Sequence, residues 1–450
     1  MWTPERHAPT APRRRAGSRA VAAWVLYDWA YGAFTTVVTT FVFATYFTQK
    51  VAPDPATGAS QWAIMQSAAG LAIALLSVPL GAVADRAGRR RAMLGAASAL
   101  MAAATLGLWF VHPRADDAML ALVLAGVGIT AFEVATVFYN AMLPDLVSPE
   151  RLGRLSMLAW GAGYAGGLTC LALSLVLLVR PSPPLFGLDP AQAEQIRATA
   201  LLAGGWLILF GWPVVAFVPE SAPRIPWRRA VREGAAELRR VLGAVRADRP
   251  LRRFLIARLL YMDGLTTLFT FGGIYAAGEF GLSASEVLLF GIGLNVAAGL
   301  GALAFAFLED RIGARTTVLV SLAALSALSL TLLLTHDRAV FWVLGHALGL
   351  FVGPAQAASR SLMARMAPAD ARAAYFGLFA VSGRITGFVG PLWFGLATAA
   401  FASQRAGMAV IVALLATGAV LLAFVPSPPA MPAPSPPTNA GMSRQPGDVV

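Results

Sequence analysis

Long apolar runs dominate this chain and limit what it can fold into. An α-helix needs about 20 consecutive apolar residues to cross the roughly 30 Å hydrocarbon core of a bilayer. Transmembrane β-strands are short and alternate in polarity, whereas these Ala-, Leu- and Gly-rich runs do not alternate. The sequence therefore predicts an all-α integral membrane protein with twelve transmembrane helices. The runs lie at roughly 21–48, 61–84, 91–111, 117–142, 155–179, 199–218, 254–278, 284–308, 316–335, 339–361, 373–399 and 407–425.

The distribution of basic residues predicts how these helices are oriented. Only 13% of the 450 residues are charged, whereas a soluble domain carries roughly a quarter. If successive runs alternate in direction, 27 of the 35 Lys and Arg fall on one side of the membrane and six on the other. By the positive-inside rule, both termini are expected in the cytoplasm, at the cell (inner) membrane if the source is prokaryotic. The formal charge of +12 then reflects topology, and nucleic acid is not an expected partner.

A break in the apolar pattern divides the chain into two parts. Residues 219–253 contain prolines and ten arginines and leave six runs on either side, as expected for two repeats joined by a linker. We expect a six-helix half at 20–218, a central cytoplasmic loop at 219–253 and a second six-helix half at 254–426. The ends, 1–19 and 427–450, are rich in Pro, Arg, Ser or Ala without periodicity, which is typical of disorder.

Internal repetition supports a duplicated unit. The segment GAVADRAGRRR begins at Gly81 after the second run, and the shorter EDRIGAR begins at Glu309 after the eighth. A period of 225 residues relates Asp85 to Asp310. The Leu-Tyr-Asp sequence that ends at Asp28 in the first run is echoed by Leu-Tyr-Met-Asp in the seventh.

The duplicated motif resembles that of a known superfamily. The Gly-x-x-x-Asp-Arg-x-Gly-Arg-Arg pattern from Gly81, its degraded copy from Glu309 and twelve runs in two halves look like the major facilitator superfamily. The resemblance covers about residues 21–425. It implies a central pathway lined by the first and fourth helix of each half.

Four shorter segments resemble one family within that superfamily. YDWAYGAF from Tyr27 is similar to the Tyr-Asp-Trp-Ala-Asn-Ser-Ala-Phe run of the autophagy-related vacuolar effluxer-like family. FYNAMLPD from Phe138, QAASRS from Gln356 and VSGR from Val381 also resemble it. The resemblance implies export of amino acids. The departures are Tyr31 and Gly32 in place of Asn and Ser, and Arg384 in place of the more frequent Lys.

Ionisable residues inside four runs are candidate site residues. Asp28, Glu133, Asp263 and Arg384 would be costly in lipid unless they face a cavity or are paired. Each lies about 8–11 residues from the cytoplasmic end of its run, roughly 12–17 Å at 1.5 Å per residue, so the four could meet in one layer. Helical spacing adds polar, small and aromatic neighbours. The candidate substrate and ion pathway comprises Asp28, Tyr27, Trp29, Thr35, Glu133, Asn140, Asp263, Thr267, Gln356 and Arg384.

These residues allow two interpretations. In the functional one, a carboxylate takes a proton or an amine of the solute, and Arg384 binds a carboxylate through two hydrogen bonds. In the other, the charged residues are buried ion pairs between helices or snorkel toward the interface, as we expect for Arg258. Tyr27 and Trp29 could likewise be packing or interfacial residues.

The duplicated motif is a candidate gate latch. An aspartate at one helix end and arginines at the next can form charge-assisted bonds that hold the halves together and break when the cytoplasmic side opens. The alternative is topogenic charge alone, with Gly88 as an ordinary turn residue. The candidate latch comprises Gly81, Asp85, Arg86, Gly88, Arg89, Arg90, Asp310 and Arg311.

Motifs for other activities are missing from the sequence. A P-loop needs Gly-Lys-Ser/Thr, but the sole lysine, Lys50, lies between Gln49 and Val51, so ATP is not an expected partner. No His-Glu-x-x-His or Gly-x-Ser-x-Gly occurs either. We therefore expect no enzyme, no catalytic residue, no cofactor and no metal site.

The leading prediction is a secondary active transporter that moves a small polar solute across the bilayer by alternating access, with the proton as the candidate coupling ion. Two alternatives stay open. One is a drug or lipid exporter of the same fold, and the other is a non-transporting membrane scaffold or receptor.

Overall fold

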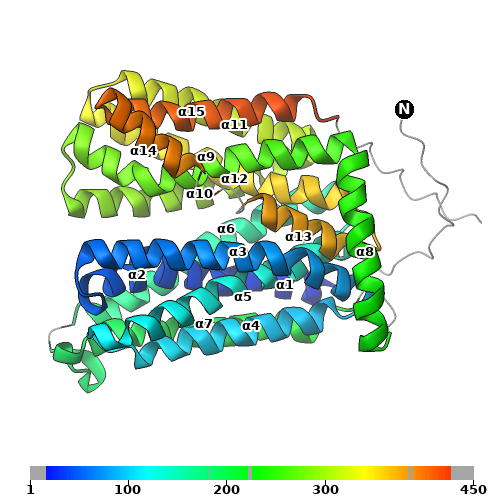
Figure 1. Ribbon diagram of the computed structural model, residues 1–450, viewed down its shortest axis with the longest axis horizontal. Helices are drawn as coiled ribbons and strands as arrows, with labels where there is room; N and C mark the ends of the chain where they lie inside the picture. The colour runs from blue at the N-terminus through cyan, green and yellow to red at the C-terminus, as the bar shows by residue number, and fades with distance from the viewer. Residues whose placement is uncertain (1–16, 182, 221–224, 384–386, 388, 427–450) are drawn as a thin grey trace, which may run out of the picture.

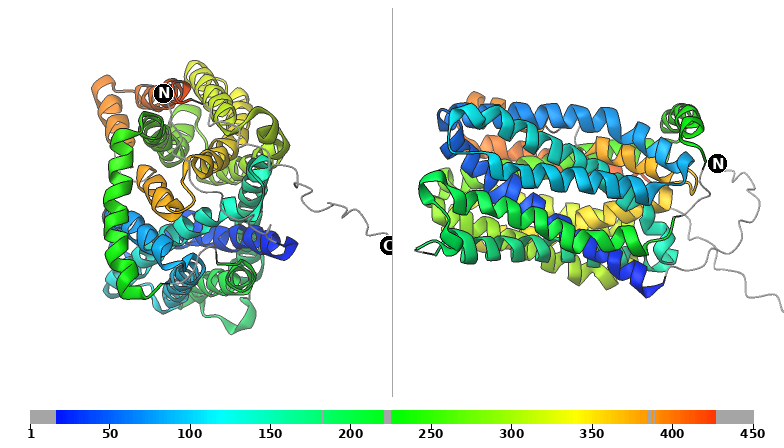
Figure 2. Two further views of the ribbon diagram at one scale, coloured as in Figure 1. Left: turned by 90° about the vertical axis from the view of Figure 1, so that its right-hand side faces the viewer. Right: turned by 90° about the horizontal axis from the view of Figure 1, so that it is seen from below.

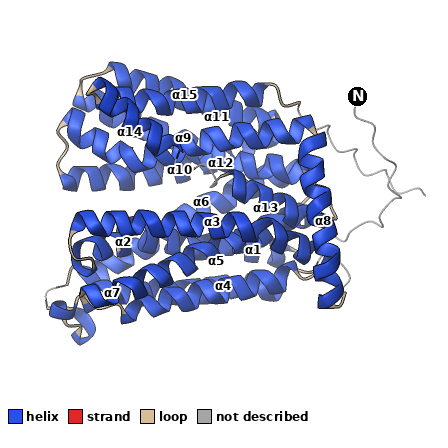
Figure 3. Ribbon diagram, viewed as in Figure 1, coloured by secondary structure: helices blue, strands red, loops and turns tan. Residues whose placement is uncertain are grey.

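The computed structural model describes residues 17–181, 183–220, 225–383, 387 and 389–426. Regular structure in these residues is helical throughout (Figure 3). The helices are α1 (Ser18–Ala33), α2 (Phe43–Tyr46), α3 (Pro55–Ala87), α4 (Arg90–Gly107), α5 (Ala118–Leu146), α6 (Leu152–Leu173), α7 (Glu194–Phe217), α8 (Trp227–Ala247), α9 (Arg249–Phe280), α10 (Ala284–Ile312), α11 (Ala314–Leu334), α12 (Arg338–Met366), α13 (Arg372–Ser382), α14 (Val389–Phe401) and α15 (Gln404–Ala423).

The predicted all-α membrane fold is confirmed. In the described part of the chain, eleven helical stretches are long and apolar enough to cross a membrane. They match every predicted run except 373–399. That run contains the shorter helices α13 and α14, and residues 384–386 and 388 between them lie outside the described part.

The long helices form two groups that lie on either side of a central plane (Figure 1). Helices α1 to α7 make up the first half and α9 to α15 the second. Two seams join the halves: α3 packs against α13, and α6 packs against α10. Because α3 and α10 carry the two copies of the repeated motif, the two seams are related by the same duplication.

Backbone contact between α1 and α6 depends on glycine. A Cβ atom added to Gly32 would overlap the carbonyl oxygen of Gly163, and one added to Gly166 would overlap that of Trp29. Small residues allow such close approach of neighbouring helices. The two helices are therefore in direct backbone contact beside the centre of the molecule.

Helix α8 lies within the predicted loop 219–253 and crosses the ends of the other helices (Figures 1 and 2). Its inner face buries Glu237 and Val241, and Gly234 packs closely on Val83 of α3. We call the end of the bundle that holds α8 and the two motif copies the motif end.

Candidate functional site

A cavity of about 380 Å³ lies between the two halves. The first half contributes side chains from α1, α5 and α6, and the second half from α9, α10, α12 and α13. Five of the predicted pathway residues line it: Asp28, Thr35, Glu133, Asn140 and Gln356. The polar residues that the sequence places on one face of single helices thus contribute to the lining of this cavity.

An ion pair crosses from one half to the other at the cavity wall. Arg360 Nη1 on α12 lies 3.1 Å from Asp28 Oδ2 on α1, and the two residues are 2% and 1% exposed. Tyr139 donates its hydroxyl proton to the same Asp28 oxygen over 2.8 Å, and Arg360 Nε donates to Ser156 Oγ over 2.9 Å. Asp28 Oδ1 is buried and has no hydrogen-bond partner among the described residues. One oxygen of this carboxylate is thus held by Arg360 and Tyr139, and the Tyr31 hydroxyl also interacts with the carboxylate from the cavity lining.

Aromatic rings surround the Arg360 guanidinium. Its central carbon lies 5.1 Å from the ring centre of Trp24 and 5.8 Å from those of Tyr139 and Trp160. Trp24 and Tyr139 stack with ring centres 4.3 Å apart, and Trp24 Nε1 donates to the Tyr139 carbonyl. A weakly hydrated guanidinium packs well against the faces of aromatic rings. Arg360 is therefore a buried positive charge held in place at the cavity wall.

Arg360 corrects one expectation. Because the tenth apolar run ends near 361, the sequence predicts that Arg360 is one of the topogenic arginines of the cytoplasmic side. Helix α12 continues to Met366, which places Arg360 inside the bundle. Gln356 lies four residues earlier on the same helix face, and this spacing was the signal for Arg360. Arg384, a predicted pathway residue, lies outside the described residues.

Glu133 and Arg258 bring further charge to the cavity. Glu133 is 9% exposed, and its carbonyl accepts the Thr136 hydroxyl over 2.8 Å. The Arg258 guanidinium lies over the Phe379 ring at 3.4 Å and donates to Ser382 Oγ over 2.9 Å. The expectation that Arg258 snorkels to the interface is therefore wrong, because its side chain turns into the bundle. The cavity combines two acidic with two basic side chains.

Thr35 lies where the first transmembrane helix changes its winding. The segment Phe34–Phe41 is π-helical, and the hydroxyls of Thr39 and Thr40 both donate to the Thr35 carbonyl over 2.8 Å. β-branched residues lower helix propensity, and hydroxyls that bond to backbone carbonyls bend helices. Such π-helical turns frequently occur at functional sites.

Asp263 and Thr267 do not reach the cavity. Asp263 is 3% exposed, and its Oδ2 accepts the Gly390 backbone N–H over 2.8 Å. Thr267 packs so closely on Gly390 that an added Cβ there would overlap its hydroxyl. A carboxylate is favoured at the first turn of a helix, and α14 begins at Val389. Asp263 is thus not part of the single layer of charged residues that we expected at the cavity.

Tyr27 and Trp29 also lie away from the cavity lining. The Tyr27 hydroxyl lies 2.7 Å from Ser98 Oγ on α4. Trp29 stacks on Trp206 of α7 with ring centres 5.7 Å apart. Both side chains pack α1 against its neighbours in the first half.

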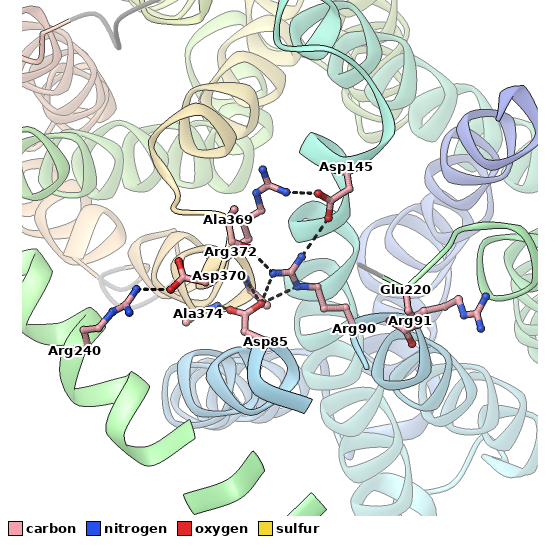
Figure 4. A network of polar contacts seen from close by, with 11 residues as sticks. Asp85, Arg90, Arg91, Asp145, Glu220, Arg240, Ala369, Asp370, Arg372 and Ala374 are labelled. Atoms are coloured by element: carbon pink, nitrogen blue, oxygen red, sulfur yellow. Dashed lines mark hydrogen bonds and ion pairs between the residues drawn. The ribbon is translucent and has the colours of Figure 1, made fainter. Parts of the chain in front are cut away.

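The first copy of the motif holds the end of a helix from the other half (Figure 4). Asp85 accepts the backbone N–H groups of Ala373 and Ala374 over 3.1 and 3.0 Å. These groups belong to the first turn of α13, where the helix dipole favours an anion. Asp85 also accepts Arg90 Nε over 2.7 Å, so its charge is neutralised within the motif.

Arg90 extends this contact into a network. It reaches Asp145 on α5 over 3.3 Å and the Ala369 carbonyl over 3.3 Å, and Arg372 forms a further ion pair with Asp145. A Cβ on Gly81 would overlap the backbone at Ala373. Asp145 and Arg372 were not predicted, because spacing within one helix does not show which residues of other helices face the motif.

The remaining latch candidates have separate places. Arg86 pairs with Glu237 of α8, and Gly88 has a φ of 61°, a left-handed conformation that glycine adopts most easily. Arg89 and Arg311 are exposed, and neither forms an ion pair in the described part of the chain. Of the predicted latch arginines, Arg90 and not Arg89 therefore contacts the second half in the described part of the chain.

The second copy makes a similar contact at the other seam. Asp310 Oδ1 accepts the backbone N–H of Arg154 in the first turn of α6 over 3.0 Å. The neighbouring Glu309 is fully buried and accepts the Ser361 hydroxyl. Gly153 leaves room for this carboxylate, since an added Cβ would overlap it.

This chain is similar to known membrane proteins. The uncharacterized MFS-type transporter YxiO of Bacillus subtilis is 25% identical over 407 residues, which are 90% of this chain and 94% of that protein. Autophagy-related protein 22 of Kluyveromyces lactis is 24% identical over 327 residues. That match covers 65% of this chain and 64% of the relative, so the chain spans less than two thirds of its length.

A solved structure and a family model define the fold and the family. The major facilitator superfamily proton:xylose symporter XylE, bound to 6-bromo-6-deoxy-D-glucose, matches with a TM-score of 0.63 and 13% identity over 91% of this chain and 96% of that one. The fold is therefore that of the major facilitator superfamily. The model of the family described as "Vacuole effluxer Atg22 like" matches residues 16–433. The chain belongs to this family.

Proposed function

We propose that this protein is a secondary transporter that moves a small polar solute through the central cavity by alternating access. The observation that carries the proposal is the buried Asp28–Arg360 pair, which joins the two halves at the wall of that cavity. In proteins of this fold, the halves rock about a site between them. The names of the relatives, among them an MFS-type transporter, support transport.

The proposed solute is an amino acid, and the proposed direction is export. Two acidic and two basic side chains line the cavity, which matches a solute carrying one charge of each sign. An arginine can bind a carboxylate through two parallel hydrogen bonds, and a carboxylate can accept from an ammonium group. The family description as effluxers supports the direction.

Asp28 is the proposed carrier of a coupling proton. Its Oδ1 is buried without a hydrogen-bond partner in the described residues, so this oxygen is available to a proton or to the solute. The other oxygen, Oδ2, is held by Arg360 and Tyr139. Solute that binds Arg360 would therefore release Asp28 to take up a proton.

The motif end is proposed to face the cytoplasm, together with both termini. The excess of arginines in and around 219–253 supports this orientation. The Asp85 and Arg90 network joins the halves at this end, so the proposed state is closed toward the cytoplasm. The six-helix halves are proposed at 20–218 and 254–426.

Transport in proteoliposomes tests the proposal. The purified protein should accumulate a labelled amino acid in response to a pH gradient. Asp28→Asn should still exchange solute and lose pH-driven accumulation, and Arg360→Gln should weaken solute binding at least tenfold. Arg311→Gln, an exposed site away from the cavity, serves as the control and should behave as wild type. Normal pH-driven transport by stable Asp28→Asn and Arg360→Gln proteins would contradict the assigned roles, and no transport of any solute would favour a scaffold or receptor.

An adjoining apolar cavity supports a second candidate function. This cavity of about 320 Å³ shares Thr40, Phe41 and Asn295 with the central one and is otherwise lined mainly by apolar side chains of the second half. It would suit an amphipathic drug or lipid. Transport of such a compound that is unchanged in Asp28→Asn would favour this candidate over an amino acid carrier.

A further inference from the structure

Helix α8 carries a stripe of arginines on its outer face. Arg228, Arg232, Arg239 and Arg246 are all exposed. They are spaced by 4, 7 and 7 residues, so at 3.6 residues per turn they fall within an arc of about 40°. The stripe extends over about 27 Å at 1.5 Å per residue. We call these four residues the arginine stripe.

The acidic groups near α8 are already engaged by other arginines. The buried Glu237 pairs with Arg86 and lies 3.4 Å from Arg240. Arg229 pairs with Glu233 over 2.6 Å. No member of the arginine stripe forms an ion pair within the described chain. Arg232 lies close enough to Glu233 to act on it through its charge, but Arg229 already binds that carboxylate, so the stripe keeps an excess of positive charge.

Arg240 ties α8 to the second half as well. It donates to Asp370 in the segment before α13 over 2.8 Å (Figure 4). Burial alone would raise the pKa of Asp370, but the bond to Arg240 outweighs it and the pKa is lowered, so the pair is charged at neutral pH. Through Glu237 and Arg240, α8 is attached to both halves at the motif end.

The position of α8 suggests what covers its outer face. The helix lies along the edge of the bundle when the motif end faces the viewer (Figure 2). Val231 and Leu242, next to the stripe, are 46% and 47% exposed. Basic residues beside apolar ones on one helix are typical of segments that lie in the membrane interface.

We propose that the arginine stripe of α8 binds the phosphate groups of anionic phospholipids in the leaflet at the motif end. Guanidinium groups bind phosphate oxygens through two hydrogen bonds, and juxtamembrane clusters of basic residues attract anionic lipids. Because α8 is attached to both halves, bound lipid stabilises the closed motif end. The inference does not depend on the identity of the solute or on transport itself.

Native mass spectrometry of the full-length protein, titrated with phosphatidylglycerol or phosphatidylcholine, tests the proposal. The variant Arg228→Gln/Arg232→Gln/Arg239→Gln/Arg246→Gln removes the stripe. Its matched control, Arg19→Gln/Arg89→Gln/Arg151→Gln/Arg311→Gln, removes four other exposed arginines. We expect the wild type to retain phosphatidylglycerol at least tenfold better than phosphatidylcholine. The stripe variant should lose most of this preference, and the control should keep it within about twofold.

Three results would overturn the proposal. They are equal retention of both lipids by the wild type, an equal loss in the two variants, and displacement of the lipid by millimolar inorganic phosphate, which would indicate a site for free anions. A fourth protein, with all four stripe residues changed to Lys, covers the case in which the Gln variant fails to fold. It keeps the charges and loses the two-bond geometry, so an intermediate preference supports the proposal and an unchanged one contradicts the role of the guanidinium groups.

Discussion

The two copies of the repeated motif hold the same kind of helix end with different sets of charges. In the first half, Asp85 accepts two N–H groups of α13 and an arginine. In the second half, Asp310 accepts one N–H group of α6. The contact between a carboxylate and the first turn of a helix from the opposite half is therefore common to both, and the arginine network is an addition.

The arginine of the second copy that corresponds to Arg90 binds a different partner, which explains this difference. Arg315 lies 225 residues after Arg90, yet its guanidinium donates to the Ala423 carbonyl at the end of α15. In the first half α5 ends near Asp145, which accepts Arg90. In the second half the last turn of α12 carries the basic Arg365. A base in that place offers Arg315 no partner, and Arg365 acts on Asp310 only through its charge, so we expect the second copy to be the weaker latch.

The largest expected effect is that of Asp85→Asn. The change leaves Arg90 without its nearest carboxylate, and breaking a buried pair costs about 3 kcal/mol, roughly a hundredfold change in the ratio of closed to open states. Distances between spin labels placed on α3 and α13 at the motif end should lengthen. Weaker solute binding with unchanged distances would place Asp85 in the substrate pathway and not in the latch.

For the glycines of the two turns, we expect the larger loss of stability in the second copy of the motif, the reverse of the order expected for the aspartates. Gly313 has φ 84° and ψ 153°, a region open almost only to glycine, so Gly313→Ala should cost about 2 kcal/mol. Gly88 has φ 61°, and Gly88→Ala should cost about 1 kcal/mol. Unfolding of the two variants in detergent measures the difference. Equal losses would show that the turns tolerate a side chain equally.

A smaller shift is expected from Asp310→Asn. The asparagine can still accept the Arg154 N–H, and only the charge is lost, which is worth about 1 kcal/mol at a helix N-terminus. Spin labels on α6 and α10 should report roughly a fivefold change toward the open state. If the shift equals that of Asp85→Asn, the arginine network adds nothing and the comparison between the copies fails.

The smallest effect is expected for Arg89→Gln. The side chain is exposed and forms no ion pair within the described residues, and such surface changes usually stay within about 0.5 kcal/mol. The distances at the motif end should match those of the wild type. A clear shift would mean that Arg89 joins the network in a state other than this one.

Periodicity predicted the helices and much of the cavity, because both depend on one helix at a time. Asp28 and Glu133 were found from an ionisable residue inside an apolar run, and Gln356 from its helix face. The prediction that Asp263 lines the cavity was not met. The spacing of polar residues shows that one face of the helix is polar, but not which helix packs against that face. Here α14 packs against it, and the Gly390 N–H donates to Asp263. Arg360 was missed because charge near the end of a run looks topogenic.

The glycine contact between α1 and α6 has a mechanical consequence. Where Gly32 meets Gly163, backbone rests on backbone, and there is no deformable side chain between them to absorb a displacement. A displacement of α1 at Asp28 is therefore expected to move α6 with it as a rigid body. The first turn of α6, at Arg154, lies roughly 14 Å along the helix from Gly163. The contact therefore places the carboxylate in the cavity and the helix end that Asp310 holds on two helices that share one rigid backbone contact.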